Sequence, residues 1–378
     1  MHGLLISDDR PPENQDEPSA KDMVVSGGRG DHRPPSDPGN DRYHGPVEDT
    51  RDVIVIGAGP AGLAVAIAAE EAGLSCEIVE KGVLVNSIYH FPHGMTFFTT
   101  PELLEIGGLP LVTPYEKPTR LEALKYYRRV VDTFGLHVSL GVKVVAVERE
   151  GGVFRVTAEP DGAETPGSGP ARARRARNLV FATGYYDHPN PLGVPGEDLP
   201  HVSHYYDEPH PFYRKRVVVV GGKNSAAIAA LELYRAGATV TLVHRGDSLS
   251  DRIKYWIRPD IKNRIKEGSI AARFEARVVE ITPEHVAIEG PDGREEIEAD
   301  AVFLLTGYHP DPVLLEGLGV HVDDELLKPD HDPDTFETNV PGVYLAGSIV
   351  SGRDTNLTFI ETGRFHGAAI VRAILAKS

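Results

Sequence analysis

Apolar runs and helical patterns alternate along most of the chain and predict an α/β protein. Residues 53–56 form a continuous apolar run, which is typical of a strand buried on both faces of a sheet. An alanine-rich stretch over residues 63–73 predicts a helix that ends at glycine, and residues 75–80 predict a second strand. Strand, helix and strand in this order make one βαβ unit.

The same pattern recurs in the second half of the chain. An apolar run at 217–220 leads into a predicted helix at 225–236, and a strand follows at 240–243. Later in each half a predicted strand ends in Thr-Gly-Tyr, at 181–185 and again at 304–308. We therefore expect two Rossmann-like, dinucleotide-binding modules in tandem.

The end of the chain indicates how the two modules are connected. A strand at 343–346 and a helix at 359–376 follow the second module, and we assign both to the first domain. A length of 378 residues also favours two domains. The first domain is expected to comprise residues 51–190 and 304–378, with the second domain, residues 191–303, inserted between these parts.

Composition and charge narrow the classes of function. Residues 1–50 are rich in Gly, Pro and acidic side chains with a single aromatic residue, so we expect a disordered tail. The 56 acidic and 39 basic side chains give a net charge of −17, which opposes general binding to nucleic acid or to an anionic membrane. We see no targeting segment and expect a cytoplasmic protein. With Cys76 as its only cysteine, the chain cannot form an internal disulfide or a cysteine-based zinc site, and we expect no metal.

The first candidate site is the glycine pattern between the first predicted strand and helix. In such a pattern the glycines permit a tight turn, close approach of a pyrophosphate and close helix packing, while the helix N-terminus favours phosphate. Glu80 follows 23 residues after the first glycine, where a carboxylate can bind ribose hydroxyls, and Lys81 is next to it. The predicted turn residues are Gly57, Gly59, Pro60, Ala61 and Gly62.

The second candidate site is less regular, because Lys223 replaces the usual second glycine. Its second strand ends in His244-Arg245 where an acid would normally bind the ribose. An acid would repel a 2′-phosphate, whereas an arginine binds one through charge-assisted hydrogen bonds, so this site predicts NADPH. The other predicted binding residues are Gly221, Gly222, Asn224, Ser225 and Ala226.

Two dinucleotide sites imply a hydride relay in which an electron acceptor, FAD, stays bound at the first site. At this point the sequence resembles the thioredoxin-reductase type of flavoprotein over residues 52–376. Three stretches, 221–226, 253–264 and 359–367, look more narrowly like the bacillithiol disulfide reductase family. The resemblance implies an NADPH-dependent oxidoreductase that acts on a low-molecular-weight disulfide, and we expect a homodimer.

The resemblance also implies further FAD contacts. They would come from the turn at Gly347 and Ser348 and from the start of the last helix, at Phe359 and Ile360. The aromatic stretch 87–98 either walls the flavin or is a plain aromatic core patch.

The sequence departs from its relatives in its thiols. Residues 185–216 lack the CxxC of true thioredoxin reductases, and Ala61 stands where many bacillithiol disulfide reductases have a cysteine. Cys76 lies in a predicted strand, where a buried thiol is usually inert. We therefore assign no catalytic side chain.

Three other functions stay open at this stage. Residues 194–205 loosely resemble the fingerprint of flavin-containing monooxygenases. A ferredoxin- or flavodoxin-NADP reductase of thioredoxin-reductase type and a non-catalytic redox sensor are the other two. Four arginines at 172, 174, 175 and 177 are expected to form a solvated loop, and the histidines at 201, 204 and 210 are not expected to bind metal.

Overall fold

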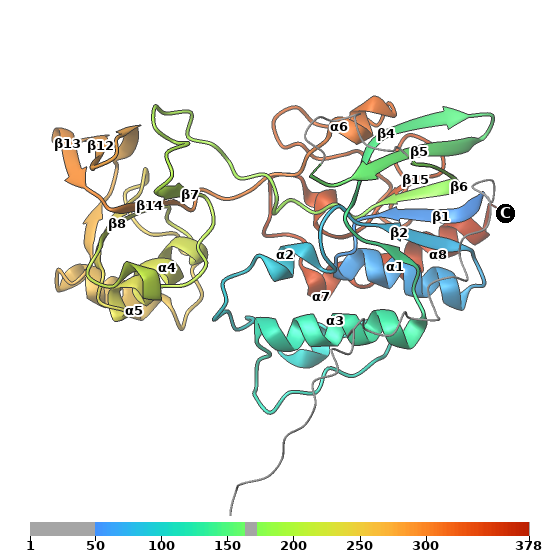
Figure 1. The fold of residues 1–378 in the computed structure, drawn as a ribbon, viewed down its shortest axis with the longest axis horizontal. Coiled ribbons are helices and arrows are strands. Elements are labelled where there is room, and N and C mark those ends of the chain that lie inside the picture. Colours follow the sequence, from blue (N-terminus) through green and yellow to red (C-terminus); the bar gives the residue numbers. More distant parts are fainter. Residues whose placement is uncertain (1–49, 163–171, 378) are drawn as a thin grey trace, which may run out of the picture. The chain divides into compact units, whose positions relative to one another are not determined.

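The computed structural model of the chain describes residues 50–162 and 172–377. These residues belong to one compact unit that begins at residue 47. Three sheets and the helices that cover them make up the fold (Figure 1). The tail expected over residues 1–50 lies outside the described residues, apart from Thr50.

The first sheet has seven strands in the order β3-β2-β1-β6-β5-β4, with β15 also paired to β6. Strands β1, β2, β3, β6 and β15 run parallel to one another. Strand β5 pairs antiparallel with β6 on one side and with β4 on the other. The early residues of β6 pair with β5 and its last three pair with β15. The strands are β1 (Arg51–Ile56), β2 (Cys76–Val79), β3 (Val138–Ser139), β4 (Val142–Glu150), β5 (Val153–Pro160), β6 (Arg172–Phe181) and β15 (Val343–Leu345).

The apolar run of β1 is buried on both faces of this sheet. Val53 and Val55 pack into one core cluster, and Ile54 and Ile56 pack into another. Alternate residues of a strand point to opposite faces, so a continuous apolar run serves two layers. The core cluster of Val53 and Val55 includes residues of α1 (Pro60–Glu71), α3 (Arg120–Phe134) and α8 (His366–Leu375). The cluster of Ile54 and Ile56 includes residues of α6 (Val313–Gly317) and of the β4–β5 hairpin, which belongs to the same sheet (Figure 1).

The second sheet repeats this construction in the order β10-β9-β8-β14-β7, with all neighbours parallel. Val217 and Val219 of β8 face α4 (Asn224–Arg235) and α5 (Arg258–Lys266), while Val218 and Val220 face the third sheet, β11-β12-β13. The strands are β7 (Val202–Ser203), β8 (Arg216–Val220), β9 (Thr239–Val243), β10 (Ala271–Arg273), β11 (Arg277–Ile281), β12 (His285–Gly290), β13 (Gly293–Glu298) and β14 (Ala301–Leu304).

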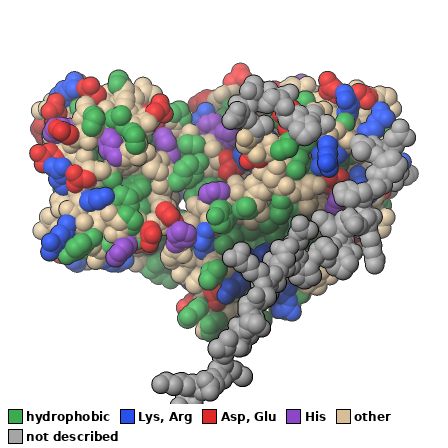
Figure 2. All heavy atoms as spheres, viewed as in Figure 1, with side chains coloured by type: hydrophobic (Ala, Val, Ile, Leu, Met, Phe, Trp, Pro, Cys, Tyr) green, Lys and Arg blue, Asp and Glu red, His purple; other side chains and the backbone are tan. Residues whose placement is uncertain are grey.

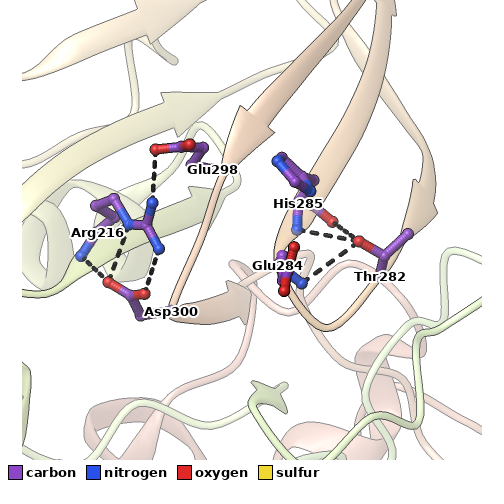
Figure 3. Close-up of polar contacts among 6 residues, drawn as sticks. All are labelled: Arg216, Thr282, Glu284, His285, Glu298 and Asp300. Carbon is purple, nitrogen blue, oxygen red and sulfur yellow. Dashed lines mark hydrogen bonds and ion pairs between the residues drawn. The ribbon is translucent and has the colours of Figure 1, made fainter.

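Polar contacts join the second and third sheets at the start of β8 (Figure 3). The backbone N–H and guanidinium of Arg216 donate to Asp300, at 2.7 and 2.6 Å, and the guanidinium also donates to Glu298. These bonds from Arg216 hold the pKa of Asp300 at about 2. The turn between β11 and β12 is closed by Thr282, whose hydroxyl oxygen accepts from the His285 N–H at 3.0 Å (Figure 3).

Two expectations about local structure are wrong. The arginine run is not a solvated loop: it lies within β6, because residues 172–176 pair with β5, and three of its arginines form ion pairs. The expected last helix is broken into α7 (Ile360–Gly363) and α8, because the Phe365 N–H bonds to the Thr362 carbonyl three residues earlier and tightens the turn. The ion pairs join Arg174 to Glu77, Arg175 to Glu150 and Arg177 to Asp52.

Three further observations concern the expected domain boundary, membrane-spanning helices and the surface charge. β14 runs to Leu304, the residue at which we expected the first domain to resume. Within the described ranges, no helix is long and apolar enough to cross a membrane. The face of the molecule in Figure 2 carries acidic and basic side chains interspersed with one another.

Candidate dinucleotide sites

The parallel strands of the first sheet bring the predicted FAD residues to one edge. β1, β2, β6 and β15 end at the same side because they run parallel. Gly57 follows β1, Glu80 follows β2, Ala182 follows β6 and Gly347 follows β15 by two residues. Ligands of α/β sheets bind at the carboxyl ends of the strands, so this edge is the first candidate site.

The glycine turn after β1 has the shape that a pyrophosphate requires. Gly57 has φ +111°, and a Cβ there would lie 2.5 Å from the Ala182 carbonyl oxygen. A Cβ at Gly62 would lie 2.1 Å from the Gly57 carbonyl oxygen, whereas a Cβ at Gly59 would meet nothing within 4 Å. The outer two glycines therefore allow close packing, and the middle one leaves its backbone open to a ligand.

The start of α1 fits an anionic group. Gly59 is the N-cap with extended backbone, Pro60 is the first helical residue, and no side chain caps the helix. The first N–H groups of a helix lack intrahelical partners, and the positive end of the helix dipole favours a negative charge. These residues thus fit the phosphates of FAD.

Glu80 clamps this turn to the end of β2. Its side chain is only 6% exposed, and its two carboxylate oxygens accept from the N–H groups of Ala58 and Gly82, each at 2.8 Å. Burial raises the pKa of Glu80, and the two backbone hydrogen bonds oppose that rise. The spacing predicted a ribose ligand and missed this second role of the carboxylate.

Lys81 forms an ion pair that the sequence did not indicate. Its ammonium lies 2.9 Å from a carboxylate oxygen of Asp187, which follows the first Thr-Gly-Tyr. The two residues are partly exposed and far apart in sequence, so no local pattern links them. The pair joins the end of β2 to the segment that leaves β6.

The structure brings the other predicted FAD residues to the same edge. A Cβ at Gly347 would lie 2.8 Å from the Ala61 Cβ, and a Cβ at Gly363 would lie 3.2 Å from the Gly347 Cα. The Ser348 hydroxyl is 3.7 Å from the Cβ position of Gly184. Phe359 is the N-cap of α7 and Ile360 is its first residue; the helix ends at Gly363, so both residues lie near the same turn.

The aromatic stretch 87–98 serves both core and surface. Ile88 of α2 (Asn86–Tyr89) and Phe97 are buried, whereas Tyr89 is 49% exposed. The buried guanidinium of Arg120 donates to the Ile88 carbonyl at 3.1 Å and to the Tyr89 carbonyl, which holds α2 against α3. The stretch is therefore more than a plain core patch.

The second sheet presents a matching turn after β8. A Cβ at Gly221 would lie 2.6 Å from the Leu305 carbonyl oxygen and 2.9 Å from the Ala226 Cβ. A Cβ at Gly222 would lie 2.4 Å from the His244 ring, so the imidazole packs directly on this turn. Burial lowers the pKa of His244, and Arg245 next to it lowers the pKa further.

The rim of the second turn is basic and partly open. Arg245 is exposed and forms no ion pair with any residue that the structure describes, so its guanidinium is free to bind an anion. Lys223, the N-cap of α4, and Ser225 are also exposed. Asn224 joins the turn to the loop after β9: its side-chain amide N–H donates to the Arg252 carbonyl at 3.3 Å and its Oδ1 accepts from the Lys254 N–H at 2.9 Å.

The single cysteine is buried in β2, as expected. Cys76 is 5% exposed, and burial raises the pKa of its thiol to about 12, with Glu70 and Glu77 adding to the effect.

Of the three histidines considered above for a metal site, His204 has its Nε2 3.3 Å from a carboxylate oxygen of Glu197. Among the described residues, no group of three or more His, Cys, Asp or Glu side chains is arranged to hold a metal ion.

Comparisons with known proteins agree with this geometry. A family model described as pyridine nucleotide-disulphide oxidoreductase matches residues 54–347. The chain is 44% identical over 325 residues to "Bacilliredoxin reductase Bdr" of Bacillus subtilis, covering 85% of this chain and 96% of that protein. The solved "Bacillithiol Disulfide Reductase Bdr (YpdA)" of Bacillus cereus has a TM-score of 0.84 and 41% identity, covering 87% of this chain and all of that one.

A flavin-containing monooxygenase from Stenotrophomonas maltophilia also resembles the chain, with a TM-score of 0.69 and 24% identity, covering 87% of this chain and 99% of that one; this likeness shows the fold alone. The comparisons confirm the expected two-module Rossmann-type flavoprotein fold, the oxidoreductase class and the cofactors FAD and NADPH. The chain belongs to the pyridine nucleotide-disulphide oxidoreductase family.

Proposed function

We propose that the chain is an NADPH-dependent flavoprotein that reduces bacillithiol disulfide. One observation carries the proposal: the likeness to the two Bacillus reductases covers 85% and 87% of this chain, and 96% and 100% of theirs, so that it includes residues of both modules. The net reaction balances as NADPH, a proton and one disulfide giving NADP⁺ and two thiols. When bound, FAD would accept the hydride and return two electrons.

In this proposal the first module holds FAD through its strand-end loops. The backbone around Gly59 would contact the pyrophosphate, because nothing fills the space beside it. Glu80 keeps that loop in place through Ala58 and has lone pairs left for ribose hydroxyls. The remaining predicted contacts come from Pro60, Ala61, Gly62 and Lys81, and from Gly347, Ser348, Phe359 and Ile360.

The second module would hold NADPH at the turn after β8. Gly221, Gly222 and the start of α4 would receive the pyrophosphate, and the free guanidinium of Arg245 would bind the 2′-phosphate. His244 would pack beside the adenosine half because its ring already lies on Gly222.

The thiol inventory decides how the disulfide would be reduced. Cys76 is buried and almost entirely protonated at neutral pH, and the chain has no other cysteine. A covalent mixed disulfide with the protein is therefore not part of the proposal. The disulfide would receive two electrons without forming a bond to a protein thiol. Proton donors in or near the site would then protonate the two thiolates.

The test is anaerobic reduction of the purified protein by NADPH, followed by addition of bacillithiol disulfide with measurement of thiol release. Reoxidation with two thiols per NADPH supports the proposal. Rapid reoxidation only by oxygen would favour the monooxygenase, only by ferredoxin or flavodoxin the electron-transfer reductase, and by no acceptor the redox sensor.

We propose a cytoplasmic location and a homodimer, and the net charge of −17 favours the absence of a nucleic-acid partner. The division into residues 51–190 with 304–378 and residues 191–303 likewise remains a prediction. Light scattering tests the homodimer, and limited proteolysis tests the division into domains.

A further inference from the structure

One buried histidine touches the first site without a role in the proposed function. His366, the first residue of α8, is 8% exposed, and its Nδ1 accepts a hydrogen bond from the Gly347 N–H at 3.2 Å. A nitrogen that accepts this bond carries no proton, so the imidazole is neutral with its hydrogen on Nε2. The bond fixes the residue that opens the turn after β15.

That turn has little freedom of its own. Gly347 has φ +76°, and its Cβ position is 2.8 Å from the Ala61 Cβ at the start of α1. On its other side, the Cβ position of Gly363 is 3.2 Å from the Gly347 Cα, and that of Gly367 is 2.5 Å from the Ala64 carbonyl oxygen. The turn is thus enclosed between the phosphate-binding end of α1 and the α7–α8 segment, and His366 belongs to that segment.

The imidazole is held in one orientation by an aromatic stack. The Phe336 ring lies on His366 with centroids 4.0 Å apart and planes 18° from parallel. The His331 ring in turn stacks on the Phe336 ring, with centroids 6.0 Å apart. Phe336 has φ +60°, a conformation that a bulky residue adopts only when its surroundings impose it.

We propose that His366 is a positioning residue, a neutral acceptor that fixes Gly347 against α1 and so determines how firmly the first module holds FAD. The proposal rests on FAD occupying the first site, as proposed above. His366 need not touch FAD: it acts through the backbone of Gly347, whose Cβ position lies 2.8 Å from the Ala61 Cβ. Removing the acceptor leaves a buried N–H without a partner, and the turn then loosens.

The burial of His366 and the nearby His331 favour the neutral form of its imidazole. Burial lowers its pKa to about 4, and His331 lowers it as well. α1 carries no charged residue before Glu70, so that helix offers no counter-ion nearby. The titratable and charged side chains on the other elements packed here are His331, Asp332, Asp334 and Glu337 of the segment before β15, Tyr344 of β15, and Glu361, Arg364 and Arg372 of α7 and α8.

The direction of the pH effect follows from these values. A histidine that titrates near its ordinary value of 6.5 in the unfolded chain and at about 4 in the fold stabilises the fold fully above pH 6.5. That stabilisation is lost progressively as the pH falls from 6.5 towards 4. An asparagine at this position offers Oδ1 in place of Nδ1 and does not titrate.

The experiment compares the wild type with His366→Asn and His366→Leu. At pH 7.5 we expect His366→Asn to bind FAD within about threefold of the wild type, and His366→Leu to bind it about tenfold more weakly or worse. Affinity is measured by quenching of flavin fluorescence on the apoprotein, with circular dichroism as the check on folding. Equal affinity of the wild type and His366→Leu would show that the site needs only the shape of the side chain and would overturn the proposal.

The pH series is the second, independent readout. The temperature of FAD release should fall more for the wild type than for His366→Asn between pH 7.5 and 5.0, because all other groups are common to both. Parallel curves would overturn the proposal even if His366→Leu does not fold. A chain that binds FAD but reduces no disulfide refutes the proposed function alone, and a wild type that binds no FAD refutes both.

Discussion

Replacing Cys76 with alanine should leave disulfide reduction nearly unchanged. With a pKa of about 12, only about 3 in 100,000 of the thiols are ionised at pH 7.5, compared with about 3 in 100 for a thiol at the ordinary value of 9.0. Burial thus reduces the reactive form about a thousandfold, in addition to blocking access. Cys76→Ala removes one buried sulfur atom and should cost about 1 kcal/mol of stability.

The assay is NADPH oxidation with bacillithiol disulfide, followed by thiol release under anaerobic conditions. Cys76→Val serves as the matched control, because it also lacks a thiol but fills the space left in β2. If Cys76→Ala is impaired and Cys76→Val is active, the loss is one of packing. The reasoning is refuted if both variants fold, hold FAD and accept hydride from NADPH but release no thiol, since Cys76 would then be catalytic.

Three other outcomes are expected. The protein should purify yellow with FAD, and FMN should not replace it, because the turn at Gly57 is built for a dinucleotide; a colourless protein whose spectrum FAD does not alter would contradict this. Arg245→Ala should lower kcat/KM for NADPH by about 10- to 150-fold and spare NADH, with the exposed Arg277→Ala as control; equal losses with both nucleotides would exclude a phosphate contact. Glu80→Gln should weaken FAD binding about tenfold, because its amide NH₂ would face one of two backbone donors, and an unchanged dissociation constant from flavin fluorescence would argue against the clamp.

Features that depend on neighbouring residues could be predicted from the sequence. The apolar runs of β1 and β8, the glycine turns after them and the acid or arginine at the next strand end are all set by local spacing. The burial of Cys76 followed from its place in a strand. These predictions succeed because strand alternation and glycine conformations are determined within a few residues.

The tertiary structure alone decided which distant residues meet. Arg174 reaches Glu77 across 97 positions, and this partner together with pairing to β5 turns a basic run into a strand. Lys81 meets Asp187, and Glu80 meets the N–H of Ala58, only because parallel strands end at one edge. Whether His366 is a surface residue or a buried acceptor depends on the return of β15 to the first sheet, which closes α8 over α1. Such contacts depend on how the chain returns to its own earlier segments, and no local pattern records that path.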